Sequence, residues 1–189
     1  MENYIEFIEK EHIYLIDGII VPSVTQLLKK LFPCKYENIP EKILEDKSIY
    51  GIELHKFIEI IEKKKPKNPL GYIKRYYNPT IYQEESIKDY LKIKEKYAIE
   101  ITDSEKRIHY KNKYGGTLDL KGYVNGKSAI IDIKTTYELD KVYVAWQNSM
   151  YELADGMVDE LYCMWLPKGR LGKLVKLERI EKDFILAII

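Results

Sequence analysis

The chain has 189 residues, enough to bury a substantial core, and we expect one α/β domain over 1–189. The charges of its 31 basic and 30 acidic side chains nearly cancel, so the net charge does not indicate a nucleic-acid partner. Two cysteines are too few for a disulfide framework, a four-cysteine zinc site or an iron–sulfur cluster. No apolar run reaches the roughly 18 residues of a membrane span, and the start lacks signal-peptide features, so we expect a cytoplasmic protein.

The first thirty residues predict a small β-hairpin that leads into a helix. Strands are expected over 4–9, 12–16 and 19–21, with a turn at Asp17-Gly18. Ser23 and Gln26 have the spacing of a capping box. The helix should therefore begin after Ser23 and run to about Leu31, ahead of Pro33.

A longer helical region follows, from 41 to 64 and again from 82 to 97, with Gly51 as a weak point in the first helix. The basic run 63–67 is expected to be a solvated helix end, with contact to a phosphate backbone as the alternative, and a loop should follow it. Four apolar residues of the first helix could form its buried stripe: Ile52, Phe57, Ile60 and Ile61.

The second half of the chain changes to a strand pattern with one helix inside it. Strands are expected over 99–110, 116–124, 127–135, 158–166 and 173–179, and a helix over 141–154. This order is typical of an α/β sandwich with a central mixed sheet flanked by helices. The apolar end 184–189 should pack on the chain's own sheet or on a partner.

Asn125-Gly126 between two β-rich runs is a strong signal for a hairpin with a two-residue turn. The turn predicts the register: Val124 faces Lys127, Leu120 faces Ile131, and Asp119 lies opposite Asp132. Opposed side chains have Cβ atoms roughly 5 Å apart, and like charges there are destabilising. A divalent cation between the two carboxylates would remove that repulsion.

Alternation along the hairpin separates an apolar face from a charged one. Asp119, Asp132 and Lys134 share the charged face, where Lys134 could orient or deprotonate an attacking water. The structural alternative is an exposed sheet face with ordinary ion pairs, which contribute little to stability. The apolar face is expected to hold Leu118, Leu120, Val124, Ala129, Ile131 and Ile133.

Four motifs and the opening segment resemble the PD-(D/E)XK nuclease superfamily, and within it the RecB-type and phage exonuclease branch. Gly116–Asp119 is similar to the Gly-x-x-Asp motif, and Asp132–Lys134 to the Asp-x-Lys motif. Gln147–Tyr151 resembles Gln-x-x-x-Tyr, and Gly51–His55 resembles the upstream histidine motif. Val21–Thr25 is similar to the opening of small exonucleases of this type. The resemblance implies a restriction-endonuclease-like α/β sandwich.

The resemblance also implies a site for one or two Mg²⁺ or Mn²⁺ ions. Its ligands would be His55, Asp119, Asp132 and the carbonyl of Ile133, with Lys134 as the catalytic cation. For His55, a structural role in a mostly apolar helix is the alternative. Glu105 lies in the preceding strand, and we do not assign it as a ligand.

Contacts to DNA are implied for four further residues. Gln147 and Tyr151, four apart on one helix face, would position the strand, although a core role for Tyr151 is the alternative. Ser23 and Thr25 could bind phosphate at a helix N-terminus, although the capping box already gives Ser23 a structural task. Tyr143 and Trp146 could stack on bases, with Trp146 equally well placed in the core.

Together these features predict a metal-dependent deoxyribonuclease. We expect an exonuclease that acts on single-stranded or frayed DNA ends in phage-type recombination, replication or repair, with recombination or replication proteins as further partners. Two alternatives stay open: a structure-selective endonuclease, and a non-catalytic protein that binds nucleic acid or a host factor.

Overall fold

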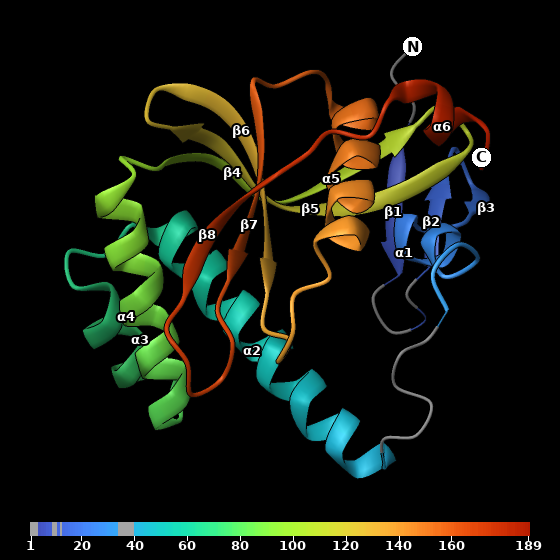
Figure 1. The fold of residues 1–189 in the computed structure, drawn as a ribbon. Coiled ribbons are helices and arrows are strands. Elements are labelled where there is room, and N and C mark those ends of the chain that lie inside the picture. The colour runs from blue at the N-terminus through green and yellow to red at the C-terminus, as the bar shows by residue number, and fades with distance from the viewer. Residues whose placement is uncertain (1–3, 9–10, 12, 34–39) are drawn as a thin grey trace.

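The computed structural model describes residues 4–8, 11, 13–33 and 40–189, and begins with a three-stranded antiparallel sheet (Figure 1). Its strands are β1 (Ile5–Ile8), β2 (Ile13–Ile16) and β3 (Ile19–Val21), as the sequence predicts. The expected strand ends at Glu9 and His12 lie outside the described residues. All three predicted N-terminal strands are therefore confirmed.

The short helix α1 (Val24–Leu28) begins with the predicted capping box. Ser23 Oγ accepts a 3.1 Å hydrogen bond from the Gln26 amide, and the Ser23 amide donates to Gln26 Oε1 over 2.8 Å. These reciprocal bonds satisfy amides that the first turn leaves without intrahelical partners. The α-helix is shorter than expected, because turn hydrogen bonds replace it after Leu28.

Three helices follow: α2 (Glu41–Lys64), α3 (Pro69–Tyr77) and α4 (Ile81–Lys96). Gly51 does not interrupt α2. The prediction of a loop at α3 is wrong, although Asn68 caps the helix and Pro69 occupies its first position, both ordinary start signals.

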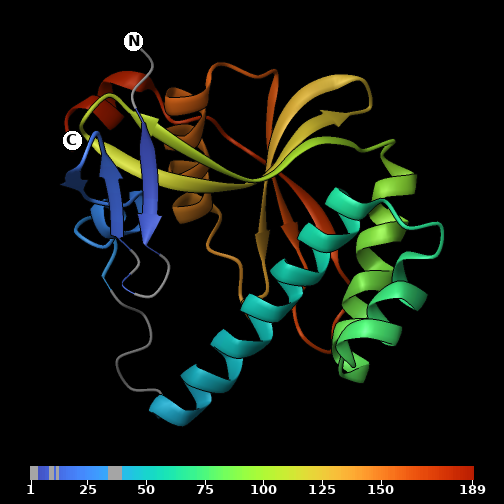
Figure 2. The same ribbon diagram turned by 180° about the vertical axis from the view of Figure 1, so that it is seen from behind.

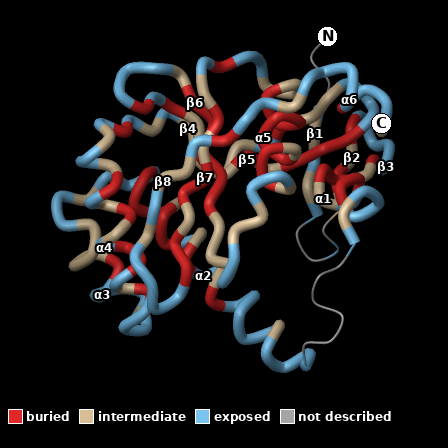
Figure 3. The backbone as a smooth tube through the Cα atoms, viewed as in Figure 1, coloured by how far each residue is buried: buried red, intermediate tan, exposed pale blue. Residues whose placement is uncertain are grey.

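The N-terminal half of α2 extends away from the sheet and is largely exposed (Figures 1 and 3). Ile52 is 66% exposed there, so its assignment to the buried stripe is wrong. Phe57, Ile60 and Ile61 are buried as predicted, because only the second half of α2 contacts the sheet.

The main sheet contains β4 (Glu100–Tyr110), β5 (Tyr114–Val124), β6 (Lys127–Lys134), β7 (Glu160–Trp165) and β8 (Lys173–Leu177), in that order. All neighbours are antiparallel except β6 and β7. A parallel pair needs a crossover, which the helix α5 (Lys141–Asp155) supplies. The expected mixed sheet flanked by helices is confirmed.

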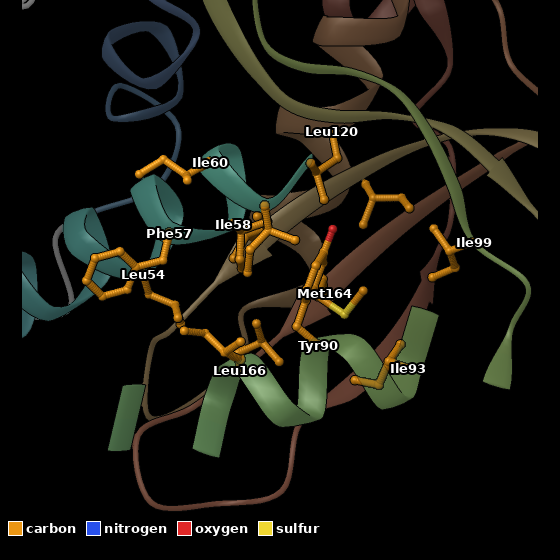
Figure 4. Close-up of a cluster of buried hydrophobic side chains, with 14 of the residues drawn as sticks. Leu54, Phe57, Ile58, Ile60, Tyr90, Ile93, Ile99, Leu120, Met164 and Leu166 are labelled. Carbon is orange, nitrogen blue, oxygen red and sulfur yellow. The ribbon is translucent and has the colours of Figure 1, made fainter. Parts of the chain in front are cut away.

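Helices cover both faces of this sheet. On one face α2 and α4 pack through Leu54, Ile58 and Tyr90 (Figure 4), and Figure 2 shows α2 crossing that side diagonally. On the other face α5 and α1 pack against Ile130 and its neighbours. Consecutive residues of β6 alternate between these two clusters, as a strand buried on both faces requires.

Leu118 departs from the predicted pattern. It was expected on the face of Leu120 and Ile131, yet it packs with Tyr114 and Ile130 in the α5 cluster. Strand β5 is long and bends between its two halves (Figure 1), so simple alternation fails across the bend.

The C-terminal apolar segment packs on the chain's own core, as one of the two expected arrangements. The short helix α6 (Lys182–Leu186) buries Ile185, and Ile188 and Ile189 pack beside it in the α5 cluster. Among the described helices, none combines the length and apolar character needed to cross a membrane.

Candidate metal centre

The hairpin β5–β6 has the predicted register from Val124–Lys127 to Leu120–Ile131. One residue further the pairing changes character. Instead of a backbone contact with Asp132, the Asp119 side chain reaches across, and its Oδ2 accepts a 2.7 Å hydrogen bond from the Ile133 amide. The expected face-to-face pair of Asp119 and Asp132 is therefore replaced by a carboxylate fixed on the backbone of β6.

The second oxygen of Asp119 faces α2. Asp119 Oδ1 lies 3.7 Å from His55 Nδ1, and Glu105 Oε1 lies 3.9 Å from the same nitrogen. One ligand atom from each of the three residues lies within 4.8 Å of the other two. A helix and two strands thus bring an imidazole and two carboxylates to one point.

Glu105 belongs to this group, which corrects its omission from the predicted ligands. Its neighbours Ser104 and Lys106 pair with Leu120 and Leu118, so Glu105 stands across from Asp119. Its φ is +52°, a left-handed conformation that a non-glycine residue rarely adopts and that costs free energy. Strained backbone conformations of this kind cluster at functional sites. Here the strained residue is the one whose carboxylate points toward His55.

Asp132 and Lys134 form a buried ion pair next to this group. Asp132 is 2% exposed, and Lys134 Nζ lies 2.9 Å from its Oδ1 and 2.8 Å from its Oδ2. The ammonium makes a well-directed hydrogen bond to Oδ1 alone, which leaves Oδ2 with unused acceptor capacity. A buried acceptor without a donor is costly unless a cation or water satisfies it.

The electrostatics of the centre reflect burial of several charges together. Burial raises the pKa of Asp132 to about 6; Lys134 opposes this rise and the nearby Asp119 adds to it. Burial also raises the pKa of Asp119, against the opposing charges of His55 and Lys134. For His55, burial lowers the pKa, but Asp119 and Glu105 outweigh that effect, so its pKa is raised. The centre therefore holds a proton readily and would release it to a cation.

Gln147 and Tyr151 lie behind Lys134 on α5, and both are buried. Lys134 Nζ donates to Gln147 Oε1 over 3.0 Å, and Gln147 Nε2 donates to the Tyr151 hydroxyl over 2.7 Å. This chain fixes the ammonium beside Asp132. Direct contact of these two residues with DNA stays a prediction.

The remaining predicted residues make contacts of other kinds. Ser23 is buried and occupied as the cap of α1, with Thr25 Oγ1 at 3.3 Å from its hydroxyl. The Ile133 side chain is buried as expected, while its carbonyl as a ligand stays a prediction. Tyr143 and Trp146 both meet Phe32 edge-on, which involves them in packing.

The N-terminal sheet also reaches the centre, through a residue that the sequence analysis did not single out. The Tyr14 hydroxyl lies 2.9 Å from Thr117 Oγ1, two residues before Asp119 on β5. A Cβ on Gly115 would lie 2.7 Å from the Tyr14 side chain, so this approach requires glycine there. No local pattern reveals a contact between residues a hundred positions apart.

The donor set fits a divalent cation. Octahedral Mg²⁺ or Mn²⁺ with bonds near 2.1 Å places its ligand atoms about 3 to 4.2 Å apart, close to the spacing of the His55, Glu105 and Asp119 atoms. Imidazole and carboxylate ligands are shared by several divalent cations, so the group indicates a divalent-metal site without selecting the ion.

Comparisons with known proteins leave the family open. No protein-family model matches the chain, and no curated protein matches it. Among solved structures, twelve chains match, including one titled "Crystal structure of SSO0001". That chain shares 16% sequence identity, with 71% of this chain and 68% of that chain covered, at a TM-score of 0.37.

Proposed function

We propose that this protein is a metal-dependent deoxyribonuclease of the PD-(D/E)XK type. The observation that carries the proposal is the meeting of His55, Glu105 and Asp119 beside the buried pair of Asp132 and Lys134. A metal-binding group alone has many uses. A lysine fixed within hydrogen-bond distance of a carboxylate next to that group is suited to displacement at phosphorus, where negative charge must be offset.

In this proposal His55, Glu105 and Asp119 hold the cation, and Asp132 supplies a further oxygen. When bound, the cation would act as a Lewis acid on a phosphodiester and lower the pKa of a water. Lys134 places its ammonium at the edge of the centre, where it orients the attacking water and offsets charge on the phosphate. Asp132 anchors Lys134 from one side.

Gln147 and Tyr151 complete this arrangement from behind. Gln147 accepts a hydrogen bond from Lys134 and donates one to Tyr151, so the lysine has a fixed direction before substrate arrives. A preorganised cation avoids reorganisation during the reaction, which is the main source of electrostatic catalysis. Since both residues are buried, we assign them this positioning role in addition to the predicted contact with DNA.

We further propose exonuclease action on single-stranded or frayed DNA ends, on the resemblance of the Gly51–His55 and Val21–Thr25 segments to that branch of nucleases. The test is a cleavage panel of end-labelled linear single-stranded, linear double-stranded and circular single-stranded DNA, with Mg²⁺, with Mn²⁺ and with EDTA. We expect degradation of linear single strands that EDTA abolishes.

The circular substrate separates the alternatives. Intact circles beside degraded linear strands support an exonuclease, whereas nicked circles identify an endonuclease. Cation binding in calorimetry without cleavage of any DNA or RNA would replace the enzyme by a binding protein. Undiminished cleavage in EDTA would refute the metal-dependent mechanism.

A further inference from the structure

A cavity of about 510 Å³ opens next to the candidate metal centre, between α2 and the loop that joins β6 to α5. From α2 it is lined by Lys47, Ser48 and Gly51, among others, and from the loop by residues 135–140. This volume falls within the range of small-molecule sites and can hold a nucleoside. Neither the ligands nor Lys134 lines it, so the cavity is separate from the metal centre.

Both walls of the cavity are formed by chain segments that also carry residues of the metal centre. Gly51 and His55 are four residues apart on α2 and therefore project from the same side of the helix. Thr135 follows Lys134 directly in the chain. A Cβ on Gly51 would lie 2.9 Å from Thr135 Oγ1, so the two walls approach closely at the end nearest the centre. A nucleic-acid strand with a phosphate at the proposed metal centre would have this opening beside it in the direction of Gly51 and Thr135.

The loop wall presents an aromatic platform. Tyr137 is 61% exposed although the Arg170 guanidinium lies 3.6 Å from its ring centroid. Arg170 Nη1 also donates to the Tyr137 carbonyl over 3.3 Å, which holds the guanidinium in place. Exposed tyrosine rings and stacked guanidinium planes are the groups on which unpaired bases stack.

The charges of the lining indicate which part of a nucleotide fits. Glu138 and Asp140 lie on the loop wall, and the Asp140 carboxylate accepts a hydrogen bond from the Tyr143 amide as the cap of α5. Carboxylates at this wall disfavour a phosphate inside the cavity. Lys47 on the opposite wall attracts the backbone at the rim. A neutral base is the part that the cavity accepts.

We infer that this cavity binds the base of the nucleotide next to the scissile phosphate, with Tyr137 as its stacking platform. The inference rests on the proposed nuclease function and names a subsite of it. An unpaired base is required, because a base within a duplex cannot enter a cavity between a helix and a loop. The cavity therefore supplies a structural reason for a preference for single-stranded or frayed ends.

Binding to a DNA hairpin with a six-nucleotide single-stranded tail tests the subsite. The duplex fixes the register, and one abasic residue is moved along the tail, in versions with 5′ and 3′ tails. Fluorescence anisotropy with Ca²⁺ measures affinity independently of cleavage. We expect the wild-type protein to lose about tenfold in affinity at one tail position, a typical effect of one stacked base.

Tyr137→Ala should bind the intact tail about tenfold more weakly and become insensitive to the abasic residue at that position, while Tyr137→Phe behaves as the wild type. Tyr123→Ala, at an exposed tyrosine that does not line the cavity, is the matched control. An unchanged abasic profile in Tyr137→Ala would overturn the inference.

A second pair of variants fills the cavity instead. Ser48 lines it, whereas the adjacent Ile49 is exposed and does not. Ser48→Phe should weaken tail binding with Mn²⁺ affinity unchanged, and Ile49→Phe should change neither. Equal binding by both variants contradicts the subsite. If DNA is cleaved but no tail position shows an abasic effect, the subsite alone is refuted. If one tail position shows the effect but no DNA is cleaved, the nuclease function alone is refuted.

Discussion

The backbone amide of Ile133 donates a 2.7 Å hydrogen bond to Asp119 Oδ2, so β6 itself determines where the Asp119 carboxylate points. The other oxygen, Oδ1, is left facing His55 Nδ1 at 3.7 Å. One carboxylate thereby closes the open end of a hairpin and forms part of a three-residue group. Substitutions at this position therefore affect both tasks.

Asp119→Asn keeps an acceptor for the Ile133 amide and removes the negative charge. We expect Mn²⁺ affinity to fall at least about 100-fold and DNA cleavage to disappear, because a neutral amide is a weak ligand for a hard cation. Isothermal titration calorimetry and the cleavage panel measure the two effects. Asp183→Asn, at an exposed carboxylate of α6, is the matched control and should change neither.

Lys134→Met should separate catalysis from metal binding. The methionine preserves the length of the side chain but leaves Asp132 without its cation. We expect cleavage to fall by about 10² to 10³, the usual loss when one electrostatic stabiliser is removed, with Mn²⁺ affinity changed by less than tenfold. Lys121→Met, which also breaks an ion pair on the sheet, should retain cleavage. Full activity in Lys134→Met contradicts the assigned role.

Glu105→Gly should stabilise the metal-free protein while damaging the centre. Glycine relieves the left-handed φ of +52°, and the loss of the carboxylate removes repulsion with Asp119. We expect a gain of about 1 kcal/mol in the free energy of unfolding, or roughly 2–4 °C in Tm, measured in EDTA.

Two controls separate strain from charge in that experiment. Lys111→Gly relieves a similar φ of +47° away from the centre and should stabilise without altering Mn²⁺ binding. Glu105→Gln retains the strain and should weaken Mn²⁺ binding as Glu105→Gly does. Wild-type Mn²⁺ affinity in Glu105→Gln would remove Glu105 from the ligands.

The metal-free protein should become less stable as pH rises from 5 to 8. Asp132, with a pKa of about 6, binds its proton more tightly in the folded state than in the unfolded chain, where the ordinary value is about 4. The folded state therefore holds more protons in this window, and its stability falls with increasing pH. His55, whose pKa is also raised, has the same sign above its ordinary value. Thermal unfolding in EDTA should show a decrease in Tm of a few degrees, and a smaller one in Asp132→Asn.

Added Mn²⁺ should reverse this slope. The cation binds deprotonated His55, Asp119 and Glu105, so its affinity rises as pH increases through the raised pKa of His55. Because a ligand stabilises the folded state in proportion to its binding, the increase in Tm with 1 mM Mn²⁺ should be larger at pH 8 than at pH 6. An equal increase at both values would exclude a titrating ligand.

Tyr151→Phe and Gln147→Leu test the chain of hydrogen bonds behind Lys134. Each substitution preserves volume, so we expect a reduction in kcat of about tenfold with KM for DNA unchanged if the residues act through Lys134. A selective rise in KM would instead identify them as the DNA contacts that their motif predicts. Kinetics on a linear single-stranded substrate distinguish the two results.

Local patterns predicted most of the fold. The Asn125-Gly126 turn set the register of β5 and β6 because a two-residue hairpin leaves no freedom in pairing, and apolar periodicity placed α2, α4 and α5 within a residue of their bounds. The mixed sheet was predictable because the helix α5 lies between β6 and β7, and such a crossover allows the two strands to pair in parallel. The error at Leu118 arose because alternation assumes a straight strand, and β5 bends.

The sequence by itself determined which residues are candidates for chemistry: Asp119, Asp132 and Lys134 follow from turn geometry and alternation, and His55 from its resemblance to a motif. Only the tertiary structure decided their arrangement. Glu105 joins His55 and Asp119 because β4 pairs with β5 through a Tyr110–Tyr114 turn whose residues do not dictate a register. The packing of α2 on the sheet, which no local signal encodes, brings His55 to both carboxylates and opens the cavity beside them.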